Sequence, residues 1–513
     1  MFPRLPKYIL LLPLLVFVAC SQEEATQTPA PATATPQPTA TLPEPTDTAI
    51  PPTAMPATDT PEPTGTSEPE EDDAEETASD AAEAAGYWEG VISTSGIEIS
   101  IAVEFNETDD GLTGTIDIPD QGAVGVPLEN ITYDGENIHF EIAAVDLVFD
   151  GTIAAEIIAG DFAQGAATGT FEVTAAERVE EEAAEPEVDL PYSVEEITWD
   201  IGDTIVAATL TLPEGDGPFP AVIMIAGSGP TDRDWNSPLL PGTNGSAALF
   251  ADALTRAGYA TLRYDKRVSG PNLASNVVKM IGEISLESHL EEVASGVAQL
   301  ADHEQVDANR IFALANSEGT VHAMNYQRQE SDRPLAGIIL AAPPGRTMED
   351  LMRSQIEAQV LELEDGEAIM ALYDEAVERF MAGEPVEPSP DLPNGIQQLL
   401  LGFGSPANLP FTKEIFTVDP TEWLKEIKAP VLVLIGKKDI QVDWEADGGR
   451  MEEAAEGMDN VIFVYPENAD HVFKYLETPI DEVSVADAVK YNAAGRVLDG
   501  EALAAIIGWL ADK

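Results

Sequence analysis

The sequence predicts an α/β fold with a mostly parallel sheet over residues 191–513. Short runs such as AVIMIA, AGIILAA and VLVLIG are apolar throughout, as strands covered on both faces of a sheet must be. Helical patterns lie between these runs, at about 245–256, 286–301, 318–328 and 499–511, the last with Asp499 as a candidate N-cap. Strands that alternate with helices are typical of parallel sheets. The candidate strands are 194–200, 204–212, 220–226, 259–264, 310–315, 335–341, 430–435 and 460–465.

The N-terminal residues have the pattern of an export signal. Arg4 and Lys7 precede an apolar run over residues 8–19, which is shorter than the roughly 20 residues that span a bilayer. The run ends at Cys20, the only cysteine in the chain, in a context that resembles the lipobox of bacterial lipoproteins. We therefore expect a signal peptide at 1–19 and a lipidated Cys20 that anchors an extracytoplasmic protein in the bacterial cell envelope. A plain secretory signal with an incidental cysteine is the alternative.

Three segments separate this signal from the α/β region. Residues 20–86 are rich in Pro, Thr and Ala and then become acidic, a composition that predicts a disordered linker. Residues 87–175 predict a small all-β domain, because alternating apolar residues and tight-turn signals recur along them. Its role, accessory or binding, stays open. Residues 176–190 form a second acidic linker.

The charge of the chain excludes one class of partner. There are 25 basic and 93 acidic residues, for a formal net charge of −68. Such a surface repels phosphate groups, so we expect no nucleic-acid partner. Five histidines are spread along the sequence without an H-E-x-x-H cluster, which disfavours a zinc enzyme, and no metal site is predicted.

A nucleophile is indicated where the strand at 310–315 ends. The sequence Ala315-Asn316-Ser317-Glu318-Gly319 lies between this strand and a helix. A nucleophile elbow needs a serine on a sharp strand-to-helix turn, with small residues two positions before and after it. Ala315 and Gly319 meet that requirement, so Ser317 is the candidate nucleophile.

A base and an acid follow in the order that such a fold requires. His471 comes just after the last strand, and Asp439 comes just after the strand at 430–435. We expect Asp439 to orient the imidazole of His471, which accepts the proton of Ser317. Asp443 and Asp447 are rivals for the acid in the same loop. The other histidines are poorly placed, and His322 is expected to be a packed core residue on the helix behind the serine.

An oxyanion hole would need two backbone N–H donors. One is expected from Glu318, which follows the nucleophile. The other is expected from Ser228, in the glycine-containing turn 226–230 after the strand at 220–226. The alternative for this turn is a merely tight loop.

Five short segments together carry a family resemblance. They are GSGPTDRD (227–234), YDKR (264–267), NSEG (316–319), GKKD (436–439) and DHVF (470–473). They resemble a bacterial α/β-hydrolase serine esterase family with the motifs HGSGP-x-DRD, YDKRG, GHSEGG and NHLF. The resemblance covers about residues 192–513. It implies the α/β-hydrolase fold and carboxylesterase activity on small acyl esters without a cofactor.

The sequence departs from the family motifs at Ala226, Val268, Asn316 and Thr320. These departures leave the triad intact, but the acyl and alcohol preferences of the family do not carry over. The charged residues of the motifs are expected to form structural ion pairs rather than to act as catalysts: Asp232, Arg233, Lys266 and Arg267.

Residues 346–425 form a helix-rich insertion between the sixth and seventh strands of the α/β region. We expect a cap whose inner face lines the acyl pocket, with Met352, Met370 and Met381 as contacts. The alternative is that these residues form only the core of the cap. Two rival functions remain at this point: a serine peptidase or thioesterase of the same fold, and a catalytically inactive binding lipoprotein. No oligomeric state is assigned.

Overall fold

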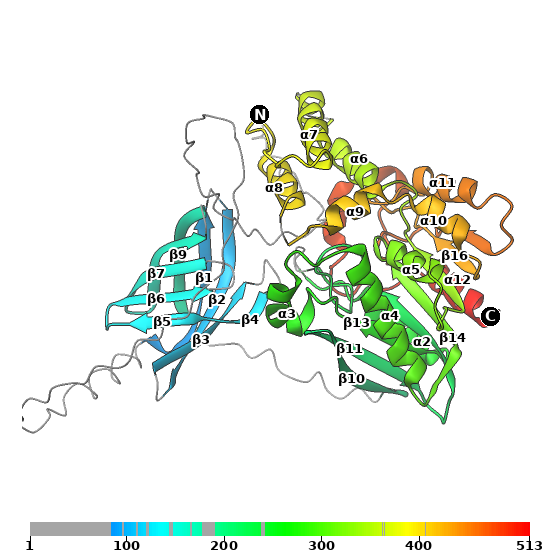
Figure 1. The fold of residues 1–513 in the computed structure, drawn as a ribbon, viewed down its shortest axis with the longest axis horizontal. Helices are drawn as coiled ribbons and strands as arrows, with labels where there is room; N and C mark the ends of the chain where they lie inside the picture. Colours follow the sequence, from blue (N-terminus) through cyan, green and yellow to red (C-terminus); the bar gives the residue numbers. More distant parts are fainter. Residues whose placement is uncertain are drawn as a thin grey trace, which may run out of the picture.

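The computed structural model contains two separate sheets (Figure 1). It describes residues 84–513 apart from 95–96, 109–110, 119–122, 143–146, 165–166, 177–189, 238–241, 362, 364 and 406. The expected signal peptide, Cys20 and nearly all of both expected linkers lie outside the described residues.

The β-rich segment expected at 87–175 contains a nine-stranded sheet in which all the strand pairs are antiparallel. Alternation along the second strand follows the sequence pattern, because Ile101, Val103 and Phe105 are buried whereas Glu104 is partly exposed. Stacked and edge-on phenylalanines, including Phe140, Phe149 and Phe171, fill the core. The strands are β1 (Gly86–Thr94), β2 (Ile97–Thr108), β3 (Gly111–Ile118), β4 (Ala123–Pro127), β5 (Glu129–Tyr133), β6 (Asn137–Ile142), β7 (Leu147–Ala154), β8 (Ile157–Gln164) and β9 (Ala167–Ala176).

The second sheet has eight strands in the order β10-β11-β13-β12-β14-β15-β16-β17. The pairs β10–β11 and β11–β13 are antiparallel, and every later pair is parallel. This is the topology of the α/β-hydrolase fold, and it confirms the predicted mostly parallel sheet. The strands are β10 (Tyr192–Ile201), β11 (Thr204–Pro213), β12 (Phe219–Ile225), β13 (Ala260–Tyr264), β14 (Val306–Asn316), β15 (Gly337–Ala341), β16 (Val431–Leu434) and β17 (Val461–Val464).

Helices of the α/β region pack on this sheet and close its core. Strands β12 and β15 and the second half of β14 are largely apolar because both of their faces are covered; Ile223, Leu314 and Ile339 are fully buried. Asp499 caps the last helix through the backbone N–H groups of Glu501 and Ala502, as predicted. The helices are α2 (Ser246–Arg256), α3 (Leu273–Met280), α4 (Leu286–Asp302), α5 (Gly319–Arg328), α11 (Ala446–Ala454) and α12 (Gly500–Ala511).

The insertion between β15 and β16 is helical, as expected. Its apolar side chains, including Leu351, Ile356 and Phe403, belong to the same continuous core as the residues of the sheet. The insertion is therefore packed onto the α/β region and is not a separately folded flap. Its helices are α6 (Met348–Val360), α7 (Gly366–Met381), α8 (Asn394–Phe403), α9 (Phe411–Thr417) and α10 (Pro420–Glu426).

Candidate active site

Ser317 lies on a sharp turn between β14 and α5. Its φ of 53° is left-handed, a conformation that L-residues other than glycine rarely adopt, and its N–H donates to Ala341 O at 2.8 Å. A Cβ on Gly319 would lie 2.5 Å from Ala226 O, so the turn can close only with glycine there. Strained turns of this kind cluster at functional sites because the surrounding structure must hold them. The local geometry is that of a nucleophile elbow.

His471 and Asp439 form a buried pair in the loops that follow β17 and β16. Nδ1 of His471 lies 2.8 Å from Oδ2 and 3.0 Å from Oδ1 of Asp439. Oδ1 of Asp439 also accepts the backbone N–H groups of Gln441 and Val442 at 2.8 and 2.9 Å. The carboxylate is thus fixed by three donors, and it can orient the imidazole.

A side chain from the elbow reaches the histidine loop. Nδ2 of Asn316 donates to His471 O at 3.3 Å, so the residue beside Ser317 contacts the backbone of the candidate base. In the sequence, Asn316 stands out only as a departure from the family motif. Asp470 was also missed; it accepts the N–H of Lys474 and pairs with Arg496, which fixes the loop that carries His471. The position of Asp470 next to the histidine was the only signal available.

The two rival carboxylates have other partners. Asp443 accepts the N–H groups of Glu445 and Ala446 at the start of α11, at 2.9 and 2.7 Å. Asp447 is fully buried and makes a two-point ion pair with Arg346 at 2.7 and 2.9 Å. Within the described structure, neither carboxylate bonds His471.

The glycine loop 226–230 lies directly against the elbow. A Cβ on Gly227 would be 3.2 Å from Cβ of Ser317. The backbone N–H groups of Ser228 and Glu318 have no acceptor among the described residues, so both are free to bind a substrate oxygen. This is the property that an oxyanion hole requires.

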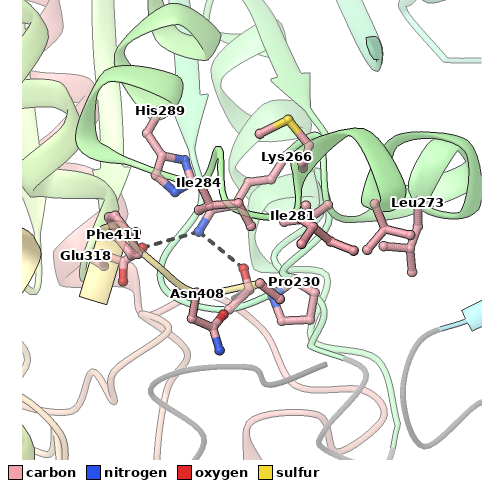
Figure 2. Close-up of a pocket in the computed structure, with 14 residues that line it drawn as sticks. Pro230, Lys266, Leu273, Ile281, Ile284, His289, Glu318, Asn408 and Phe411 are labelled. Atoms are coloured by element: carbon pink, nitrogen blue, oxygen red, sulfur yellow. Dashed lines mark hydrogen bonds and ion pairs between the residues drawn. The ribbon is translucent and has the colours of Figure 1, made fainter. Parts of the chain in front are cut away.

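Lys266 holds the glycine loop and the elbow together. Its ammonium group, on a side chain that is 4% exposed, donates to Gly227 O, to Gly229 O at 3.3 Å and to Oε1 of Glu318 at 3.4 Å. Figure 2 shows Lys266 in the centre of the site with bonds to both sides. One buried cation therefore bridges the two backbone segments that carry the free N–H groups.

A buried polar cluster continues behind the elbow, between α4 and α5. His322 contacts Oε1 of Glu318 at 3.2 Å, and its ring lies 4.3 Å from that of His289. Burial, and then the neighbouring His289, lower the pKa of His322 to about 4. Burial opposes ionisation of Glu318, but Lys266 and His322 outweigh it and lower the pKa of this carboxyl to about 2. His322 is 2% exposed, which confirms the predicted core position.

The charged residues of the family motifs form ion pairs, with the exception of Asp232. Arg233 binds Asp265 at 2.6 Å and Arg267 binds Glu292 at 3.1 Å, as expected of structural pairs. Asp232 was expected to join them, and that expectation is wrong. Its carboxylate instead accepts backbone N–H groups of the following turn, with no ion pair among the described residues.

A pocket with a mouth open to solvent lies beside the glycine loop. It is lined by Gly229, Pro230, Lys266, Val268, Leu273, Val277, Met280, Ile281, Ile284, His289, Glu318, Ala407, Asn408 and Phe411. Met352, Met370 and Met381 were expected to line it, and that expectation is wrong. Met352 and Met370 are buried in the core that the insertion shares with the sheet, whereas Met381 is partly exposed to solvent. The cap reaches the pocket through Ala407, Asn408 and Phe411 instead.

The described residues contain no group of three or more His, Cys, Asp or Glu side chains that could hold a metal ion. They also contain no helix with both the length and the apolar character needed to cross a membrane.

Comparison with known proteins gives a similarity to esterases. No family model matches the chain. The chain is 26% identical over 337 residues to esterase EstD of Thermotoga maritima, an alignment that covers 64% of this chain and 72% of the relative. Among solved structures, an esterase of Pyrococcus furiosus matches with 17% identity and a TM-score of 0.37, covering 56% of this chain and 86% of that one. A proline iminopeptidase of Mycobacterium smegmatis matches with 14% identity and the same TM-score, covering 62% and 98%.

Proposed function

We propose that the protein is a carboxylesterase-type serine hydrolase that cleaves small acyl esters through an acyl-enzyme intermediate. The similarity to the Thermotoga maritima esterase supports the enzyme class. The observation that carries the residue assignment is the left-handed Ser317, tied by Asn316 to the loop in which Asp439 fixes His471. Ser317 is the proposed nucleophile, His471 the base and Asp439 the orienting acid.

The proposed reaction runs in two half-reactions. The Ser317 oxygen attacks the ester carbonyl while Nε2 of His471 accepts the serine proton, and Asp439 stabilises the imidazolium. The N–H groups of Ser228 and Glu318 stabilise the developing oxyanion. Collapse of the tetrahedral intermediate breaks the carbonyl–alkoxy bond, and the imidazolium gives its proton to the departing alcohol. Water then attacks the acyl-enzyme by the same route, which releases the carboxylic acid and restores Ser317.

The proposed location is the bacterial cell envelope, outside the cytoplasm. The lipobox-like sequence that ends at Cys20 supports a lipid anchor in the bacterial cell envelope. The Pro/Thr-rich residues after Cys20 would then separate the membrane from the folded part.

The test is hydrolysis of p-nitrophenyl esters by the purified protein, beside a thioester and a peptide substrate. We expect ester hydrolysis to be the preferred reaction. Ser317→Ala and His471→Ala should each lose activity on the order of 10⁴–10⁶-fold in kcat, because the triad acts as a unit. Circular dichroism should show that both variants are folded. A folded variant that retains more than a few per cent of the activity would exclude these assignments.

A further inference from the structure

We propose that the pocket beside α3 is the acyl subsite, and that it selects unbranched apolar acyl chains of medium length, from butanoyl to octanoyl. The proposal rests on the proposed esterase function and adds the substrate class. Figure 2 shows the pocket with Leu273 and Ile281 on one side of Lys266 and with Glu318 and Phe411 on the other.

The position of the pocket assigns it to the acyl part of the ester. Its lining includes Gly229 from the glycine loop and Glu318 from the elbow, the two segments that carry the free N–H groups. None of its lining residues comes from the loops that carry Asp439 and His471. Because His471 must protonate the departing alcohol, the alcohol lies on the histidine side. The pocket, which takes no wall from the histidine loop, is therefore left for the acyl chain.

The apolar character and the length of the wall formed by α3 indicate which acyl chains fit the pocket. Leu273, Val277 and Met280 follow one face of α3 at spacings of four and three residues, and Ile281 and Ile284 extend the same apolar wall. Met280 lies seven positions after Leu273, which corresponds to roughly 10 Å along a helix. An extended octanoyl chain has about this length, whereas a palmitoyl chain is about twice as long.

The far wall of the pocket is held rigidly. Phe411 begins α9, and its N–H donates to Ile284 O at 3.0 Å. Glu414, on the same helix, accepts the N–H of Leu286 at the start of α4 at 2.7 Å. The ring of Phe411 packs edge-on against His289, with centroids 4.9 Å apart. The cap therefore contributes a fixed wall to the pocket, and a fixed wall can discriminate acyl length.

Two neighbouring valines on α3 provide a matched test. Val277 lines the pocket, whereas Val278 does not line it and is 51% exposed. Val277→Phe should lower kcat/KM for the octanoyl ester at least tenfold relative to the acetyl ester, because the ring occupies the space of the chain and each lost buried methylene is worth about fourfold. Val278→Phe should leave this ratio unchanged. Ile284→Ala enlarges the pocket and should raise the rate on palmitoyl esters relative to butanoyl esters.

The substrates are p-nitrophenyl esters from acetyl to palmitoyl, together with acetyl esters of alcohols of increasing size. A Val277→Phe variant that changes preference for the alcohol and not for the acyl chain would overturn the assignment. So would equal losses on all acyl lengths, or an unchanged acyl profile in both pocket variants. Failure of the proposed function has a different signature: the wild-type protein would then hydrolyse no ester and would not react with a fluorophosphonate.

Discussion

The carboxylates of Asp439 and Asp443 accept hydrogen bonds from different groups. Asp439 accepts the Nδ1–H of His471, whereas Asp443 caps the start of α11. Asp439→Asn should therefore lower kcat by about 10⁴-fold, because an amide that donates to Nδ1 selects the wrong tautomer. Asp443→Asn should retain most of the activity and lose only some stability. Steady-state kinetics on one ester would check the ranking, and a larger loss for Asp443→Asn would move the acid role to that residue.

We infer that Lys266 is a positioning residue. Its ammonium group bridges the glycine loop and Glu318, and it takes no part in the proposed chemistry. Lys266→Met should lower kcat by on the order of 100-fold with little change in KM, since a small displacement of the oxyanion donors costs about that much. A boronic acid, which mimics the tetrahedral intermediate, should lose affinity by a similar factor.

Arg267→Met is the matched control for the loss of a buried cation. Arg267 pairs with Glu292 on α4 and touches neither the glycine loop nor the elbow among the described contacts. It should lower the unfolding temperature while leaving boronic acid affinity unchanged. If both variants lost affinity for the inhibitor equally, Lys266 would have only a structural role.

The imidazole of His322 is buried between helices α4 and α5, and its burial makes the free energy of unfolding depend on pH. Burial and the neighbouring His289 lower the pKa of His322 from 6.5 to about 4 in the folded protein. Between these two pH values the unfolded chain takes up a proton that the folded protein does not. The free energy of unfolding should therefore decrease as the pH falls from 6.5 towards 4.

His322→Gln keeps a donor for Glu318 but removes the titration. Urea unfolding of both proteins between about pH 7 and about pH 4 measures the effect. The wild type should lose stability more steeply than the variant across this window. The same slope in both proteins would show that His322 does not titrate differently in the folded state.

The elements differ in how far the sequence could predict them. Strands β12, β15 and β16 were predictable because burial on both faces leaves a continuous apolar run. Helix α3 was not predicted, because it is only eight residues long and contains Asn276, Val277 and Val278, which are weak helix formers. The pocket was missed for that reason, and because its walls come from segments far apart in the chain, near residues 229, 277 and 411.

At the candidate active site, local sequence patterns carried most of the information. The strand–Ser317–helix turn and the order Ser317, Asp439, His471 are legible in the sequence, because this fold fixes which loops meet. Contacts made across the fold, such as Asn316 to the His471 backbone and Lys266 to the glycine loop, leave no local pattern. The expected contacts of the methionines with the pocket were wrong because a stripe of apolar residues on a helix does not reveal which surface packs against it.

At the scale of the whole molecule, the proposed lipid anchor at Cys20 leads to a separate prediction. Cys20→Ser removes the sulfur that would carry the lipid, so the protein should leave the membrane fraction or accumulate uncleaved. Fractionation of cells, followed by mass determination of the mature N-terminus, measures both results. Unchanged membrane attachment with normal processing would exclude the lipoprotein assignment, and wild-type ester hydrolysis by the soluble variant would show that catalysis is independent of the anchor.

In the proposed mechanism, Ser317 is an activated nucleophile. This can be measured by treating the purified protein with a fluorophosphonate and mapping the modified residue by mass spectrometry. We expect stoichiometric labelling of Ser317, with parallel loss of ester hydrolysis and no labelling of Ser317→Ala or of denatured protein. An unlabelled Ser317 in folded, ester-hydrolysing protein, or a label on a different serine, would contradict the proposed mechanism.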